Sequence, residues 1–178
     1  MERQPASSAV PYGISDLHQN VERYARLRTP LAVIVFALVL GSAMLGLLGG
    51  TGQKARAFAS DAAVLKIEYA PVLRSGNWFE MELTVAPRAD VKDLVITVDD
   101  PLWEGMSIDT IAPDAESAEA LDGTYSYHFG EVKAGERFRL KLDGQIQPRA
   151  FRRLRGDIAV LDDKRPLLTA PLAITVLP

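Results

Sequence analysis

Few side chains in this sequence are of the types that carry out chemistry. The two histidines, His18 and His128, stand apart, and neither has other ligating residues at the spacing of a metal site. Nucleophile elbows, phosphate-binding loops and HExxH helices are absent from the sequence. The chain has no cysteine, which excludes disulfides, thiolate nucleophiles and Cys-ligated metal clusters. We therefore expect a protein that is not an enzyme and that holds no metal and no cofactor.

Two pairs of adjacent carboxylates, Asp99-Asp100 and Asp162-Asp163, follow predicted strands. Calcium prefers oxygen ligands, and converging strand-end loops could bring both pairs to one ion. The alternative is turn chemistry, because an aspartate beside a proline or after a strand accepts hydrogen bonds from nearby backbone N–H groups. The sequence lacks a spaced D-x-D-x-D-G loop, which favours turns. The acidic stretch 109–122 is interpreted as a solvated loop.

A cluster of arginines is the best local indication of a binding surface: Arg149, Arg152, Arg153 and Arg155. Guanidinium groups suit carboxylates and phosphates, so this cluster predicts contact with an acidic partner surface or with anionic lipid headgroups. The alternative is that it neutralises the acidic loop of its own domain or merely solvates a long turn. Trp78 falls on the outward phase of its strand and is a second candidate contact, whereas Trp103 is expected in the core.

The net charge of −3 is unevenly distributed along the chain. Residues 1–59 contain six Lys or Arg and three acidic residues, which leaves residues 60–178 at −6. Affinity for nucleic acids depends largely on Lys and Arg that neutralise phosphates. A nucleic acid partner is therefore not expected.

An uncharged apolar run, LAVIVFALVLGSAMLGLL, extends from Leu31 to Leu48. As a helix it would be about 27 Å long, which is close to the thickness of one hydrocarbon core. Thr29 and Pro30 are suited to the N-cap and the first turn, so the spanning helix is expected to start there. The sequence predicts a transmembrane helix over residues 29–50.

The segments on either side of this run suggest an orientation. Residues 1–28 are expected to form a cytoplasmic tail with a possible short amphipathic helix, and residues 51–60 a linker. Basic residues near the two ends favour a cytoplasmic N-terminus and a signal-anchor route for the remaining domain: Arg23, Arg26 and Arg28 before the run, Lys54 and Arg56 after it. The alternative is a signal peptide cleaved after Ala57-Phe58-Ala59.

Small residues recur at a spacing of four in the predicted spanning helix. Ser42, Gly46 and Gly50 would lie on one face, where another helix could approach closely. The alternative is that small residues are simply frequent in spanning helices. The pattern predicts association with a larger membrane protein or with a second copy of the chain.

Residues 61–178 alternate apolar and polar side chains with the period of β-strands. Seven or eight short strands separated by turn residues are typical of a two-sheet β-sandwich, with a small barrel as the alternative. Gly144 is expected at a bulge or a close backbone contact. The strands are expected near residues 65–69, 78–85, 94–98, 107–111, 125–129, 136–147, 157–161 and 168–177.

The sequence FGEVKAGERFRL, residues 129–140, resembles the x-G-x-L-x-x-G-E turn of bacterial immunoglobulin-like domains. With the N-terminal span, the PVLRSG turn at residues 71–76 and the final ITVLP, the chain resembles uncharacterised bacterial single-span membrane proteins with an extracytoplasmic immunoglobulin-like domain. The resemblance covers about two-thirds of the chain and implies an immunoglobulin-like β-sandwich in the bacterial envelope. It implies no active site.

Two functions are consistent with these features. The first is a non-enzymatic, membrane-anchored accessory subunit that associates with another membrane protein, located in the bacterial cytoplasmic (inner) membrane with its C-terminal domain in the periplasm. The alternative is an envelope module that recognises a glycan, a lipid or a metal through strand-end loops around Asp99, Trp103 and Asp162.

Overall fold

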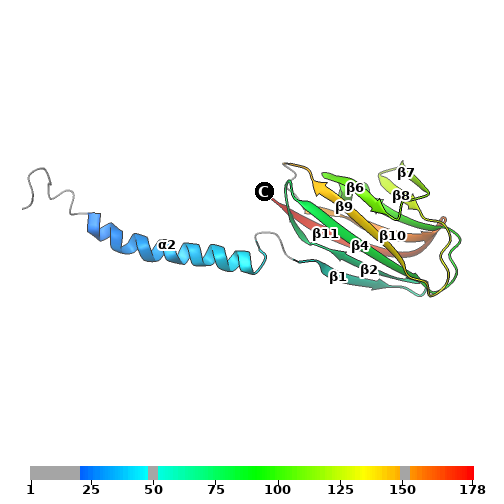
Figure 1. Ribbon diagram of the computed structural model, residues 1–178, viewed down its shortest axis with the longest axis horizontal. Coiled ribbons are helices and arrows are strands. Elements are labelled where there is room, and N and C mark those ends of the chain that lie inside the picture. The colour runs from blue at the N-terminus through cyan, green and yellow to red at the C-terminus, as the bar shows by residue number, and fades with distance from the viewer. Residues whose placement is uncertain (1–20, 48–51, 149–152) are drawn as a thin grey trace, which may run out of the picture. The chain divides into compact units, whose positions relative to one another are not determined.

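The computed structural model describes residues 21–47, 52–148 and 153–178 (Figure 1). The chain divides into a helical unit that ends at Met44 and a β unit from Leu45 to Pro178. Each unit is a separate body and is described by itself.

The helical unit contains α2, Val21–Met44, with Pro30 inside it. The prediction that the helix starts at Thr29 is therefore wrong. Pro30 has no backbone N–H, so the helix lacks the hydrogen bond that residue 30 would donate to the carbonyl of Arg26. The residues before Pro30 are good helix formers, which allows the helix to start earlier than Thr29. Among the described residues, no helix has the length and apolar character that crossing a membrane requires.

The β unit consists of two sheets, with strand order β1-β2-β4-β9-β6 in the first and β3-β11-β10-β5-β8-β7 in the second (Figure 1). All neighbouring strands are antiparallel except β3 and β11, which are parallel. The described strands are β1 Lys54–Ala59, β2 Ala63–Tyr69, β3 Val72–Arg74, β4 Trp78–Pro87, β5 Leu94–Asp99, β6 Met106–Ala112, β7 Ser117–Leu121, β8 Thr124–His128, β9 Phe138–Ile146, β10 Arg153–Asp162 and β11 Arg165–Leu177.

The order of the strands is that of an immunoglobulin-like sandwich. In chain order, β2, β4, β5, β6, β9, β10 and β11 occupy the places of strands A to G, with A-B-E-D in one sheet and C-F-G in the other. The hairpin β7–β8 is an addition between D and E that widens the second sheet on the side of β5. The predicted two-sheet, all-β sandwich is confirmed.

The core lies between the two sheets and is apolar. Alternate residues of β2, β4 and β9 face it from one side, and those of β5, β10 and β11 from the other. Its largest fully buried side chains include Leu65, Met81, Ile96, Leu140 and Ile158. Among the described residues, no polar or charged residue is buried. Successive side chains of a strand point to opposite faces, so burial of one face produces the period-two alternation in the sequence.

Among the segments that differ from the sequence prediction are two exposed strands. Residues 54–59, predicted as part of a linker, form β1 and pair with β2 from Lys54–Tyr69 to Ala59–Val64. Residues 117–121, predicted as part of a solvated loop, form β7. Both strands lie at sheet edges and are exposed over nearly their whole length, so neither carries the alternation that marks a buried strand.

A short helix, α3 Asp100–Trp103, follows β5 and packs against β10. Gly156 in β10 makes this approach possible, because a Cβ there would lie 2.9 Å from the Cβ of Asp99 and 3.0 Å from that of Leu102. The indole of Trp103 is 6% exposed, as expected for a core residue.

Candidate interaction site

One end of the sandwich collects the described members of the arginine cluster. Ser75 N donates to Leu177 O at 2.8 Å and Gly76 N donates to Ile146 O at 2.9 Å, so the β3–β4 turn meets the ends of β9 and β11. Arg153 begins β10 and pairs with Thr175 of β11, which in turn pairs with Val72 of β3. We call this end, with Arg74, Arg153 and Arg155, the arginine end.

The three arginines of the arginine end lie on one face. Leu73, which precedes Arg74, and Leu154, which lies between Arg153 and Arg155, are buried in the core. The arginines therefore project from the opposite, outer face of the second sheet. Arg153 and Arg155 are exposed, and among the described residues neither guanidinium forms an ion pair with a carboxylate. The charges of Arg153 and Arg155 are therefore available to an anionic group of a binding partner.

Trp78 lies at the same end but on the other sheet. It is the first residue of β4, and its side chain is 68% exposed on the outer face of the first sheet. It borders a hollow of about 190 Å³, which Arg74 and Asn77 also line. The structure thus places Trp78 beside Arg74 at this hollow, whereas Arg153 and Arg155 lie on the outer face of the other sheet.

The remaining predicted contact residues fall partly outside the described residues, as Arg149, Arg152 and Gly50 do. In α2, the hydroxyl of Ser42 donates to the carbonyl of Val39 at 2.7 Å. Gly46 lies beyond the end of the helix and has φ 71°. The predicted face of small residues therefore does not continue as helix from Ser42 to Gly46.

The two carboxylate pairs do not meet. Asp162 pairs with Leu94 at the start of β5, whereas Asp99 ends that strand, which separates them by about 17 Å along β5. Asp99 Oδ2 accepts a hydrogen bond from Asp157 N, and Asp162 Oδ1 accepts one from Lys92 N, each at 2.8 Å. Both side chains thus tie distant segments of the chain together instead of capping local turns, and the Asp99 side chain makes no cap hydrogen bond to α3. Among the described residues, no group of three His, Asp or Glu could hold a metal ion.

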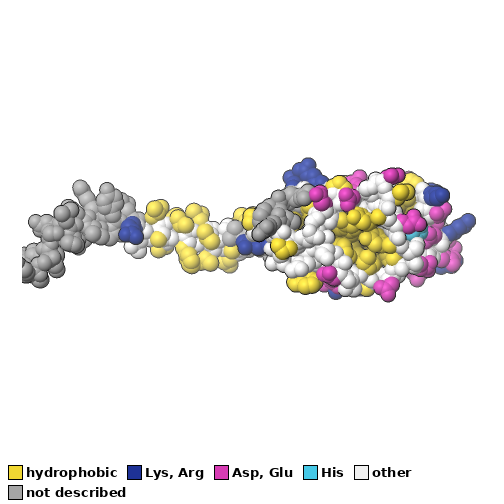
Figure 2. Space-filling view, turned by 90° about the horizontal axis from the view of Figure 1, so that it is seen from above, with side chains coloured by type: hydrophobic (Ala, Val, Ile, Leu, Met, Phe, Trp, Pro, Cys, Tyr) yellow, Lys and Arg dark blue, Asp and Glu magenta, His cyan; other side chains and the backbone are white. Residues whose placement is uncertain are grey.

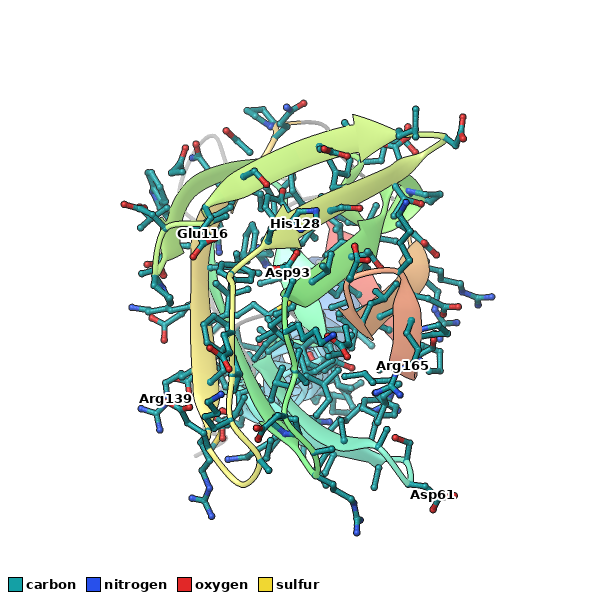
Figure 3. The ribbon with its side chains drawn as sticks, turned by 90° about the vertical axis from the view of Figure 1, so that its right-hand side faces the viewer. Asp61, Asp93, Glu116, His128, Arg139 and Arg165 are labelled. Atoms are coloured by element: carbon teal, nitrogen blue, oxygen red, sulfur yellow. The ribbon has the colours of Figure 1, made fainter. Side chains whose placement is uncertain are left out.

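The end of the sandwich opposite the arginine end contains His128, and we call it the histidine end. Figure 3 looks onto this end and shows Asp93, Glu116 and His128 close together. His128 Nδ1 lies 2.7 Å from Asp93 Oδ2, and Asp93 Oδ1 accepts a hydrogen bond from Gly130 N at 3.2 Å. His128 is thus a partly exposed, hydrogen-bonded residue.

Sequence reasoning missed this pairing because Asp93 and His128 are 35 residues apart in the chain. The Asp93 carboxylate holds the loop before β5 to the end of β8, because it bonds both to the side chain of His128 and to the backbone amide of Gly130. This arrangement ties the two segments together. Among the described residues, His128 Nε2 has no side-chain partner, so no chain of hydrogen-bonded side chains continues beyond the histidine.

The comparisons with known proteins concern the fold. No family model matches the chain, and no curated protein matches it. Among solved structures, it is similar to the CARDB domain of the PF1109 protein from Pyrococcus furiosus, in complex with di-metal ions: 14% identity, TM-score 0.43, over 67% of this chain and 93% of that one.

Two further solved structures have a similar likeness. The cohesin CaCohA2 of Clostridium acetobutylicum is 11% identical with a TM-score of 0.43, over 72% of this chain and 92% of that one. The human F-spondin reeler domain is 10% identical with a TM-score of 0.39, over 72% and 98%. Because these scores are below 0.5, the fold class rests on the strand pairing of this chain itself.

Proposed function

We propose that the chain is a non-enzymatic accessory subunit of the bacterial cytoplasmic membrane, anchored by residues 29–50, with its sandwich on the periplasmic side in contact with a larger membrane protein. One observation carries this proposal. Between Leu31 and Leu40, the apolar side chains of α2 are exposed on every side of the helix; Leu31 is 62% exposed, Phe36 65% and Leu38 68%. A helix that is apolar all round needs a bilayer or other helices to cover it.

The sequence around α2 adds to this support. The apolar run continues to Leu48, past the end of the described helix. The alternative cleavage site, Ala57-Phe58-Ala59, lies inside β1, and Phe58 packs against the core. Cleavage after Ala59 would remove an entire strand from the first sheet, so an uncleaved anchor agrees better with the sandwich.

The arginine end supplies the proposed contact of the sandwich. Strand β1, the first strand after the proposed anchor in the sequence, begins at the arginine end of the sandwich. Exposed arginines and an exposed tryptophan suit the headgroup region and the acidic rim of a membrane partner.

Carbonate extraction of membranes tests the anchor. The full chain should remain in the membrane pellet at alkaline pH, and Leu38→Arg should release it, because a charge in the hydrocarbon core costs about 2.5–3.5 kcal/mol. Release of the unaltered chain by carbonate would overturn the anchor. Protease added to spheroplasts should degrade the sandwich, whereas a sandwich protected until lysis would contradict its periplasmic location.

Affinity purification in mild detergent tests the contact. The full chain should co-purify with a membrane protein in a defined ratio. The double variant Arg153→Ala, Arg155→Ala should lose most of the co-purified membrane protein. Arg88→Ala is the matched control, because Arg88 is an exposed arginine just after the other end of β4. Equal recovery in all three samples would contradict a role for the arginine end.

A further inference from the structure

The hairpin β7–β8 ends the second sheet with an unobstructed edge. Strand β7 has a neighbour on one side only, and all five of its residues are exposed. It contains no proline and its register with β8 is regular. The edge strand β6 of the first sheet differs, because its register shifts between Ile108 and Thr110 and Pro113 follows it. Bulges and prolines are devices that block an edge, and β7 has neither.

The register identifies which backbone groups of β7 face outward. Phe129 N donates to Leu94 O at 2.9 Å, so the odd-numbered residues of β8 direct their backbone groups to β5 and the even-numbered ones to β7. The partners of these even residues are Ser117, Glu119 and Leu121. The N–H and C=O groups of Ala118 and Ala120 therefore point away from β8, where a further strand would pair.

Apolar side chains border this edge on the side that faces the first sheet. Ala118 lies opposite Tyr127, and Ala120 opposite Tyr125, and both tyrosines are only partly buried. Across the sandwich, Ile108 and Ile111 of β6 are partly buried as well. Figure 2, which views the molecule from above, shows hydrophobic side chains gathered in the middle of the β unit. The small alanines leave room above the tyrosines, and apolar side chains of an added strand would cover them.

The charge around the edge is of one sign. Residues 106–131 contain six acidic residues and no Lys or Arg: Asp109, Asp114, Glu116, Glu119, Asp122 and Glu131. Within the part of the chain that the structure describes, the first five pair with no Lys or Arg. A second copy of β7 would bring acidic side chains against acidic side chains, which disfavours a dimer through this edge.

We propose that the acidic edge, β7 with the flanking Glu116 and Asp122, binds an extended basic segment of a partner protein, which adds to the second sheet as a strand beside β7. The backbone groups of Ala118 and Ala120 pair with the segment. Its apolar side chains cover Tyr125 and Tyr127, and its Lys or Arg side chains meet the carboxylates. The proposal goes beyond the anchored subunit proposed above, since it requires neither an anchor nor the arginine end.

The test measures binding of a fluorescent, capped peptide of four Lys-Val pairs to the full chain in neutral detergent. Fluorescence anisotropy at low salt should show saturable binding that weakens as salt is added. The same peptide with N-methyl groups on alternate residues keeps its charge but cannot donate along one edge, and it should bind about tenfold more weakly. Equal binding of the two peptides would show a purely electrostatic contact and overturn the added strand.

Variants of the chain locate the site. Glu116→Gln with Glu119→Gln should weaken binding, and so should Ala120→Pro, which removes an outward N–H that the hairpin does not use. Asp61→Asn is the control, because Asp61 lies far from Glu116 in Figure 3, which looks onto the histidine end. If the glutamine variant binds as tightly as the unaltered chain, the acidic edge is not the site.

Amide hydrogen exchange gives a readout that does not depend on any substitution. Added peptide should slow the exchange of Ala118 and Ala120 specifically, because their N–H groups become part of a sheet. Unchanged exchange at both amides under saturating peptide would overturn the proposal, and so would concentration-dependent dimers of the chain that protect the same amides without peptide.

Discussion

Gly144 of β9 lies directly against Ser107 of β6: a Cβ at Gly144 would be 2.2 Å from the carbonyl oxygen of Ser107. The ring of Phe79 closes the other side of the same position at 3.0 Å. The register shift in β6 follows within three residues, so this close approach and the bulge form one local feature.

Substitution of Gly144 by alanine should therefore destabilise the sandwich. We expect a loss of about 1–3 kcal/mol in the free energy of unfolding, because a backbone carbonyl and an aromatic ring would both have to move. Urea-induced unfolding followed by circular dichroism measures it. The control is Gly52→Ala, where a Cβ has nothing within 4 Å. Equal unfolding midpoints for the two variants would contradict the close contact.

The two tryptophans should respond in opposite ways to truncation. Trp103 is 6% exposed, and Trp103→Ala should cost about 3–5 kcal/mol of stability. Trp78 is 68% exposed, and Trp78→Ala should change stability by less than about 0.5 kcal/mol. Thermal unfolding measures both. Iodide should quench the fluorescence of the Trp103→Ala variant strongly, because exposed Trp78 remains, and that of the Trp78→Ala variant weakly, because buried Trp103 remains. The reverse order would show that Trp78 is the buried tryptophan and Trp103 the exposed one.

Loss of the Asp93 carboxylate should loosen the histidine end. Asp93→Ala removes the partner of His128 Nδ1 and the acceptor of the Gly130 amide, and we expect a destabilisation of about 1–3 kcal/mol. Amide exchange should become faster at Gly130. Asp114→Ala serves as the control, since Asp114 is exposed. An unchanged exchange rate at Gly130 would count against the hydrogen bond.

Tyr125 should titrate above the ordinary tyrosine range. The pKa of its phenol is raised from 10.0, chiefly because its hydroxyl donates a hydrogen bond to the Asp100 carboxylate, with the negative charge of Asp100 as the second cause. The hydrogen bond therefore contributes fully below about pH 10 and is lost as the pH rises through the higher folded-state pKa.

NMR of chain carrying ring-labelled tyrosine measures this pKa directly. Asp100→Asn should lower it toward 10.0, whereas Asp109→Asn should leave it unchanged. A titration of Tyr125 that is the same in the unaltered chain and in Asp100→Asn would show that the hydrogen bond does not form.

The alternation of the sequence predicted the interior strands well because burial on one face leaves a period of two. The strands around Leu65, Leu83, Ile96 and Leu140 were expected from this pattern, and each contributes fully buried side chains. The edge strands β1 and β7 bury neither face and leave no such pattern, which is why they were predicted as linker and loop. A local signal for β7 existed in Asp122-Gly123, a dipeptide typical of two-residue hairpin turns, and both residues have positive φ.

The sequence by itself determined that one uninterrupted apolar run precedes an all-β domain, because hydrophobic patterning is a local property of the chain. Only the tertiary structure decided which distant residues meet. It separated Asp99 from Asp162, joined Asp93 to His128, and set Trp78 and Arg153 on different sheets of one end, since such distances follow from the order in which strands pair and not from their spacing along the chain.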